Sequence, residues 1–402
     1  MMINVKSILA YLLMSLLVGN TIIQAVHYHF GVAGLTLTTL ILISIFGATK
    51  LRALALQDII MVIFFIYLLL NYSAYNKIEI ERDFLFLIQG LIAYLIARGC
   101  GRALSPGALS KAGYNIALLA FLIIVAEFLK NGASDYQRFQ MFGDAGLASG
   151  GSPTQIYSGF AISFLILRFL ILELRSYWFG GATLGLLITA LILFGSRTSV
   201  IAISITCCVL VFLPGFIKRR NLKLLSICIF LAITLSLYVY QERLLFMTAV
   251  FSIQDDLSTL NRVLLAKEAF ERFLADPFFG YGAMRTWGAG TPHNLTLHLL
   301  ADLGIIGFTI FTIHLLILFN QIRKAHNYSG TIGTIEVRSL SVLVGYFIFV
   351  LISQQGFGGI YTDIYFYILS GLLSGATSRL LMQRKKGDSS KCRILDNSKQ
   401  ES

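Results

Sequence analysis

Residues 241–307 read QERLLFMTAVFSIQDDLSTLNRVLLAKEAFERFLADPFFGYGAMRTWGAGTPHNLTLHLLADLGIIG, and this stretch decides how the rest of the chain is interpreted. It joins a long polar loop to the start of an apolar helix. Nearly every other segment is an apolar run near the length of about 20 residues that a helix needs to cross a bilayer. This loop is therefore the segment large enough to build structure outside the membrane, and we expect any chemistry to be concentrated there.

The composition is that of an integral membrane protein. Of the 402 residues, 56% are hydrophobic and 13% are charged, whereas a soluble domain carries roughly 25% charged residues. Repeated apolar runs of about 18 residues favour helices over a barrel, which would show alternating segments of about ten residues. The net charge of +12 comes from basic residues scattered among short loops. That placement indicates membrane anchoring by the positive-inside rule and argues against nucleic-acid binding.

The apolar runs predict an all-α polytopic membrane protein with about 12 transmembrane helices and one large periplasmic loop. The predicted spans are residues 7–25, 31–49, 54–72, 84–98, 112–130, 153–172, 179–195, 198–214, 222–240, 295–319, 337–354 and 358–377. With the N-terminus inside, the short inner loops hold most of the basic residues, among them Arg98, Arg102 and Lys111.

Four parts of the chain follow from these spans. They are an N-terminal bundle of about nine spans (1–240), the large periplasmic loop with an amphipathic helix (241–294), about three C-terminal spans (295–378) and a cytoplasmic polar tail (379–402). The tail ends in KKGDSSKCRILDNSKQES. We expect this polar end to be disordered, because it has too little apolar surface to bury.

The large loop contains a predicted helix over residues 258–275. Capping chemistry and negative charge at its start come from Asp255, Asp256 and Ser258. Pro277 ends it. At about 100° per residue, one face is apolar. That face comprises Val263, Ala266, Phe270, Phe273 and Leu274. We expect the helix to lie on the outer surface of the bundle, with Arg262 at the seam and Arg272 in water.

Four arginines are predicted to lie on the outer face, where the membrane potential gives basic residues no advantage. They are Arg138, Arg197, Arg262 and Arg285. Arg197 lies in the tight turn GSRTS between two spans, where its planar guanidinium would suit phosphate oxygens. It would equally well cap the preceding helix or reach toward lipid headgroups. For the other three arginines, spacing alone favours a solvated charge.

His293 and Asn294 stand at the mouth of the tenth predicted span. A lone histidine on the outer face is more often structural than catalytic, but nearby cations would keep its ring neutral, which suits a base or an acceptor. One turn lower, His298 and Asp302 are spaced i,i+4 and can pair. Asp302 lies about two turns into an apolar helix, so it is either a functional carboxylate or a hydrogen-bond anchor between helices.

Common catalytic signatures are missing from the sequence. It has no P-loop, dinucleotide fingerprint, HExxH or GxSxG motif, and no His/Cys spacing typical of a metal site. The remaining pattern is a cationic site at membrane level with one histidine. It predicts a lipid-anchored phosphate or pyrophosphate ligand.

Together these motifs resemble the O-antigen ligase and polysaccharide polymerase superfamily of bacterial inner membranes. The resemblance rests on Arg138, on Gly195-Ser196-Arg197-Thr198, on an Arg262-led helix ending in Pro277-Phe278-Phe279-Gly280-Tyr281-Gly282, and on His293-Asn294 followed by Asp302, Gly304 and Gly307. Asp302 departs from the commoner glutamate, and the residues after Arg138 depart from the usual Pro-Asn. The resemblance covers roughly residues 138–307.

The resemblance implies glycosyl transfer at the periplasmic face from an undecaprenyl-pyrophosphate-linked glycan to an acceptor hydroxyl. It also implies a helical bundle of the lipid-donor (GT-C-like) glycosyltransferase kind that needs no metal or cofactor. Preorganised guanidiniums would stabilise the charge that develops on the pyrophosphate. The residues assigned to that role are Arg197, Arg262 and Arg138. His293 is the candidate base or a further phosphate ligand, oriented by Asn294 and Asp302.

Three functions are compatible with the sequence. A polymerase would add the glycan to the end sugar of another lipid-linked repeat unit, and a ligase would add it to the lipid A core. A non-enzymatic flippase or transporter of lipid-linked oligosaccharide would need charges along a path through the bilayer, whereas the arginines here gather at one face. We predict an O-antigen polymerase first, because polymerases are varied as a group, and a ligase second. Its expected partners are the lipid-linked donor and acceptor, membrane lipids and a chain-length regulator.

Overall fold

A computed structural model describes residues 5–19, 22, 55–75, 80–131, 153–173, 177–194, 196–212, 257–283, 292, 294–327, 334–357 and 364–400. The regular structure of these residues is helical, which confirms the all-α prediction for the described part of the chain. The helices are α1 (Val5–Val18), α4 (Leu56–Tyr75), α5 (Ile80–Ala103), α6 (Pro106–Asn131), α7 (Pro153–Arg168) continued by the π-helix η1 (Phe169–Glu173), α8 (Tyr177–Phe194), α9 (Arg197–Phe212), α12 (Leu257–Ala275), α13 (Leu295–Asn327), α14 (Thr334–Phe357) and α15 (Ile364–Gln400).

The predicted spans that fall on described residues coincide with helices, and those at 31–49 and 222–240 lie outside the described residues. Four helical segments are long and apolar enough to cross a membrane: Leu56–Tyr75, Pro106–Ala126, Leu295–Asn327 and Ile335–Gln355. Shorter apolar helices occupy Val5–Val18, Tyr157–Leu172, Gly180–Phe194 and Thr198–Phe212. The chain is therefore consistent with a polytopic membrane protein, and the total of about 12 spans stays a prediction.

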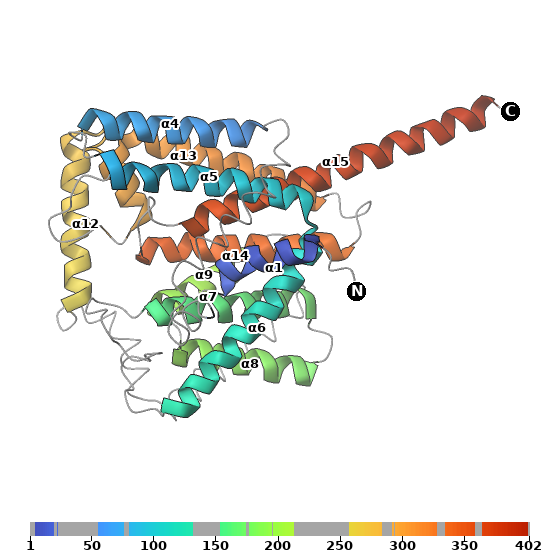
Figure 1. The fold of residues 1–402 in the computed structure, drawn as a ribbon, viewed down its shortest axis with the longest axis horizontal. Coiled ribbons are helices and arrows are strands. Elements are labelled where there is room, and N and C mark those ends of the chain that lie inside the picture. Colours follow the sequence, from blue (N-terminus) through green and yellow to red (C-terminus); the bar gives the residue numbers. More distant parts are fainter. Residues whose placement is uncertain are drawn as a thin grey trace.

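One helix runs across the others. In Figure 1, α4, α5, α13 and α14 lie lengthwise, and α12 crosses one end of this bundle. The helix predicted at residues 258–275 is thus confirmed, and it lies on the outside of the bundle as expected. We call this side of the bundle the α12 end. Its assignment to the periplasm stays a prediction.

Backbone contact between α5 and α15 fixes the middle of the bundle. A Cβ atom on Gly375 would lie 2.8 Å from the Arg102 nitrogen, and one on Gly101 would lie 3.0 Å from the Ala376 nitrogen. Small residues at such positions let two helices approach closely, which is how helices associate in a membrane. Gly371 on α15 has the same role one turn earlier, against Tyr94. The close packing of α5 against α15 was not predicted from the sequence.

The prediction of a disordered C-terminal tail is wrong up to Gln400. Helix α15 continues without a break through residues 385–400 and projects away from the bundle (Figure 1). The segment contains no proline, and Lys, Arg, Leu and Gln are good helix formers. Extending an existing helix costs far less than nucleating one, so the polar residues continue the helix begun by the apolar span.

Candidate functional site

The first residue of the candidate site seen in the structure caps α13. Asn294 accepts hydrogen bonds from the Leu297 nitrogen through Oδ1 (3.0 Å) and from the His298 nitrogen through its carbonyl (2.9 Å). These contacts satisfy amides that have no partner within the helix. His293 lies outside the described residues. The structure thus gives Asn294 a capping role, and its predicted role beside His293 is not tested.

His298 and Asp302 form the pair that their spacing predicts. His298 Nε2 lies 3.1 Å from Asp302 Oδ2, and both side chains are buried. The carboxylate therefore pairs with a histidine on its own helix, one turn closer to the α12 end. Burial of such a pair inside a membrane bundle is expected only where the two groups neutralise or hydrogen-bond each other.

Helix α13 is broken two residues after Asp302. Gly304 has φ 62° and ψ −169°, which interrupts the helical hydrogen bonds inside a continuous apolar segment. An L-residue with a side chain rarely adopts this φ, and a Cβ atom here would also collide with the Phe278 carbonyl. A broken helix at membrane depth needs other partners for its freed backbone groups.

The turn after α12 supplies those partners. Backbone hydrogen bonds run from Tyr281 N to Ala301 O (2.8 Å), Gly282 N to Asp302 O (3.2 Å), Ile305 N to Pro277 O (2.9 Å) and Ile306 N to Phe278 O (3.3 Å). The Leu303 carbonyl accepts from the Tyr67 hydroxyl of α4 over 2.9 Å. The turn thus replaces the hydrogen bonds that α13 loses at the break. We call residues 276–283 together with residues 301–306 the turn–break junction.

Two more glycines make the junction possible. Gly280 has φ 79° and Gly282 has φ 111°, both in the region that favours glycine. A Cβ atom on Gly282 would lie 2.6 Å from the Tyr75 Cβ atom of α4. The Pro-x-x-Gly-x-Gly sequence found in the sequence analysis is therefore the element that docks α12 onto the break in α13.

The predicted apolar face of α12 is wrong for three of its five residues, while Ala266 and Phe273 are half-buried. Leu265 and Ala269 are the buried residues, with 1% and 0% of their surface exposed. Val263, Phe270 and Leu274 of the predicted face are 48%, 51% and 60% exposed. Because the Ala269 side chain is small, this face of α12 can approach the rest of the protein closely. The larger apolar side chains then point outward.

Arg272 was predicted to lie in water, and this prediction is also wrong. Its side chain is 13% exposed, its guanidinium contacts Glu268 Oε1 over 2.7 Å, and it lies 5.1 Å from the ring centre of Tyr281. The carboxylate neutralises the charge, and the aromatic face favours the cation. Arg262, by contrast, is exposed on α12 instead of lying at the seam.

Arg197 is the first residue of α9. The Ser196 hydroxyl caps this helix by accepting from the Ser199 nitrogen over 3.1 Å. Arg197 is therefore at a helix start, where backbone N–H groups and the macrodipole favour anions. Its side chain lies outside the described part of the structure, as does the whole of Arg138.

Contacts between helices place the start of α9 at the α12 end. Tyr157 and Phe160, near the start of α7, pack against Tyr365 at the start of α15, with ring centres 6.5 Å and 6.0 Å apart. The end of α14 meets the start of α13, where Thr296 Oγ1 donates to Gln355 Oε1 over 3.2 Å. Because short connections join α7, α8 and α9 as antiparallel neighbours, α9 begins at the same end as α13.

Comparison with known proteins bears on these elements. Residues 182–312 match the family model described as O-antigen ligase. The match supports the resemblance to the O-antigen ligase and polysaccharide polymerase superfamily. No curated protein matches the chain. The O-antigen ligase match runs from α8 past the break in α13, so it includes the start of α9, α12 and the turn–break junction. The match supports a ligase-like or glycosyltransferase-like activity in a membrane protein.

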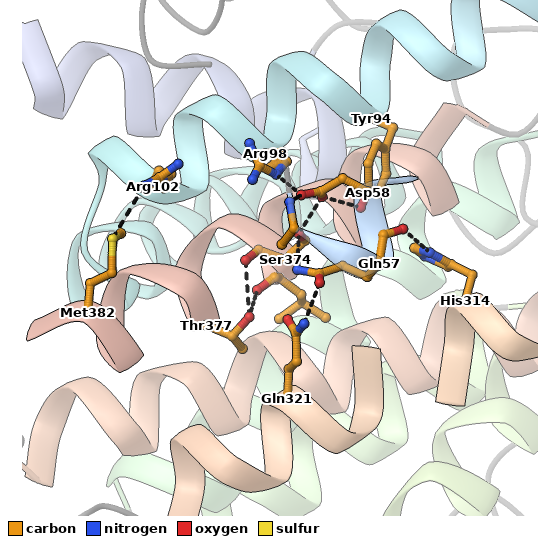
Figure 2. A network of polar contacts seen from close by, with 12 residues as sticks. Gln57, Asp58, Tyr94, Arg98, Arg102, His314, Gln321, Ser374, Thr377 and Met382 are labelled. Atoms are coloured by element: carbon orange, nitrogen blue, oxygen red, sulfur yellow. Dashed lines mark hydrogen bonds and ion pairs between the residues drawn. The ribbon is translucent and has the colours of Figure 1, made fainter. Parts of the chain in front are cut away.

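A second polar cluster lies outside the O-antigen ligase match, toward the other end of α4. Arg98 Nε lies 2.6 Å from Asp58 Oδ2, and both side chains are buried (Figure 2). Tyr94 and Ser374 donate to Asp58 Oδ1 over 2.8 Å and 2.9 Å. The prediction that Arg98 lies in an inner loop is therefore wrong, because α5 continues to Ala103.

Gln57 and His314 extend this cluster to α13. The two ring nitrogens of His314 contact the Gln57 carbonyl at 3.1 Å and the Ser370 hydroxyl at 2.8 Å, and Gln321 donates to the Gln57 side chain (Figure 2). The cluster thus joins α4, α5, α13 and α15. The signal for it in the sequence was a pair of opposite charges, Asp58 inside one predicted span and Arg98 at the end of another.

Proposed function

We propose that the protein is an O-antigen or related surface polysaccharide polymerase. It transfers a glycan from an undecaprenyl-pyrophosphate donor to a sugar hydroxyl of another lipid-linked repeat unit. The observation that carries this proposal is the turn–break junction, which fastens α12 across the end of the bundle where α9 and α13 begin. The O-antigen ligase match covers α9, α12 and α13 up to residue 312.

The proposed chemistry needs positive charge beside the donor. As the bond between the anomeric carbon and the pyrophosphate oxygen breaks, negative charge develops on the leaving pyrophosphate. Arg197 and Arg262 stabilise that charge, with Arg138 as a third ligand. The start of α9 adds the partial positive charge of its N-terminus. Guanidiniums held in place in this way supply the charge stabilisation that a metal ion gives other transferases.

The acceptor hydroxyl must lose a proton during the same step. Its oxygen attacks the anomeric carbon, undecaprenyl pyrophosphate leaves, and His293 takes the hydroxyl proton. Asn294 positions His293 through the cap of α13. Asp302 contributes from one turn lower, through its pair with His298. The active face is the α12 end, which we assign to the periplasmic side of the inner membrane.

A ligase is the second candidate, and the description of the matching family favours it. Both reactions use the same donor and differ in the acceptor. Chromosomal deletion followed by electrophoresis of surface polysaccharide separates them. Core carrying a single repeat unit indicates a lost polymerase, and bare core with accumulated lipid-linked polymer indicates a lost ligase. Unpolymerised units trapped on the cytoplasmic face would indicate transport, and unchanged polysaccharide would contradict all three functions.

A further inference from the structure

The buried side-chain amide of Asn71, on α4, hydrogen-bonds two residues of the turn in the turn–break junction. Asn71 Nδ2 donates to the Phe279 carbonyl over 2.7 Å, and Asn71 Oδ1 accepts from the Ala283 nitrogen over 2.7 Å. Both distances are those of well-formed hydrogen bonds. The orientation of the amide is fixed by its partners, because a carbonyl needs a donor and an N–H group needs an acceptor. The side chain therefore bridges the turn across its two glycines.

The same face of α4 makes further contacts with the junction. One helical turn on either side of Asn71, Tyr67 donates to the Leu303 carbonyl (2.9 Å) and Tyr75 donates to Asp276 Oδ2 (2.7 Å). Asp276 Oδ1 in turn accepts from the Phe279 nitrogen over 3.2 Å. Side chains from three successive helical turns of α4 thus bond the junction. Of Tyr67, Asn71 and Tyr75, Asn71 is the buried one.

We propose that Asn71 is a positioning residue for the glycosyl transfer described above, on which this inference rests. By holding the turn in the break of α13, Asn71 fixes the end of α12 and so the place of Arg262 relative to His298 and Asp302. Asn71 lies outside the segment that matches the O-antigen ligase family. It belongs to α4, which is far from that segment in the chain.

The length of α12 makes the position of Arg262 sensitive to its anchor. Arg262 lies about 20 Å along the helix axis from Asp276, so a rotation of about 10° at the junction would displace Arg262 by roughly 4 Å. A displacement of about 1 Å of a group that acts on the transition state can cost about a hundredfold in rate. Loss of the Asn71 contacts should therefore affect turnover more than donor binding.

The test compares three variants with the wild-type full chain in detergent. Asn71→Leu keeps a similar volume and removes both hydrogen bonds. Asn71→Asp keeps the acceptor for Ala283 and removes the donor to Phe279. Ser73→Ala is the matched control, because Ser73 is exposed on the same helix and its hydroxyl donates to the Leu69 carbonyl of its own helix. Hydrogen–deuterium exchange is measured on each variant. Transfer kinetics are measured from a purified lipid-linked repeat unit to two acceptors, a second lipid-linked repeat unit and the lipid A core.

For Asn71→Leu we expect amide exchange in residues 276–283 and 301–306 to become at least about tenfold faster. We also expect the turnover number per folded protein to fall about a hundredfold, with a smaller change in KM for the donor. Asn71→Asp should be intermediate, and Ser73→Ala should match wild type in both measurements.

Two results would overturn the inference. Unchanged exchange in Asn71→Leu means that Asn71 does not hold the junction. Faster exchange with unchanged turnover per folded protein means that the junction does not position the reacting groups. A wild-type protein that transfers glycan to neither acceptor would instead overturn the proposed function and the catalytic half of the inference, while the exchange data would still decide whether Asn71 holds the turn.

Discussion

Gly280 and Gly304 each occupy the space that a side chain on the other would need. A Cβ atom on Gly280 would lie 2.5 Å from the Gly304 nitrogen, and one on Gly304 would lie 2.7 Å from the Gly280 nitrogen. Both residues also have positive φ angles. Since one belongs to the turn after α12 and the other to the break in α13, the two elements fit only as a pair.

Replacing Gly304 with alanine should therefore destabilise the protein. A positive φ with ψ near 180° alone costs a non-glycine residue about 1–3 kcal/mol, and the collision with the Phe278 carbonyl adds to that cost. The matched control is Gly185→Ala in α8, because a Cβ atom there meets nothing within 4 Å. In a helix interior that change should be neutral or stabilising by about 0.5–1 kcal/mol. Thermal unfolding in detergent checks both, and equal stability of the two variants would contradict the junction.

Removal of the Arg262 guanidinium should abolish transfer while leaving the protein folded. Arg262 is exposed on α12, so Arg262→Ala should hardly change thermal stability. As a ligand of the developing pyrophosphate charge, it should contribute a factor of about 10²–10³ to turnover. Lys267→Ala is the control, because Lys267 is exposed on the same helix in a weak pair with Glu271 at 3.8 Å. Retained activity in Arg262→Ala would remove Arg262 from the pyrophosphate site.

The orientation of α12 shows where sequence reasoning succeeds and where it ends. The helix itself was predictable, because the charge before its start and the Pro277 signal at its end are local. Its buried face was not, because both Leu265 and Phe270 belong to plausible apolar faces and the choice depends on what the helix packs against. The Arg272 side chain is largely covered because it contacts Glu268 and Tyr281. Tyr281 lies beyond the end of the helix, so this contact has no local signal.

The turn–break junction shows the same limit over longer distances. Both of its glycine motifs were visible in the sequence, and both were assigned to the candidate site region. Their mutual docking was not predictable, because the hydrogen bonds join residues 276–283, 301–306 and α4 across long stretches of chain. Asn71 carries no local signal, since a single asparagine in an apolar span has many roles.

The burial of Arg272 predicts a loss of stability in Arg272→Ala. The change removes the contact to Glu268 and the stacking on Tyr281, and it leaves a partly buried carboxylate. Hydrogen bonds to charged groups contribute about 1.5–3 kcal/mol, so the melting temperature in detergent should fall clearly below that of Lys267→Ala. A variant as stable as Lys267→Ala would show that the contacts of Arg272 contribute little to folding.

The buried ion pair between Asp58 and Arg98 should behave as a unit. Removing one partner leaves an uncompensated buried charge, which costs about 3–5 kcal/mol. We therefore expect Asp58→Leu alone to reduce the amount of folded protein sharply. The double change Asp58→Leu with Arg98→Met should recover much of that loss, because no buried charge remains. Fluorescence-detected size exclusion of tagged variants measures this, and a double variant worse than both single variants would contradict the pairing.

The pair between His298 and Asp302 predicts non-additive effects on turnover. If Asp302 supports the reaction by holding His298, then Asp302→Asn and His298→Gln should each lower the turnover number, and the double variant should be no worse than the worse single one. Thr312→Val is the control, since the Thr312 hydroxyl donates to the Phe308 carbonyl of its own helix. Fully additive losses would instead mean that Asp302 acts on the reaction independently of His298, for example by orienting His293 directly.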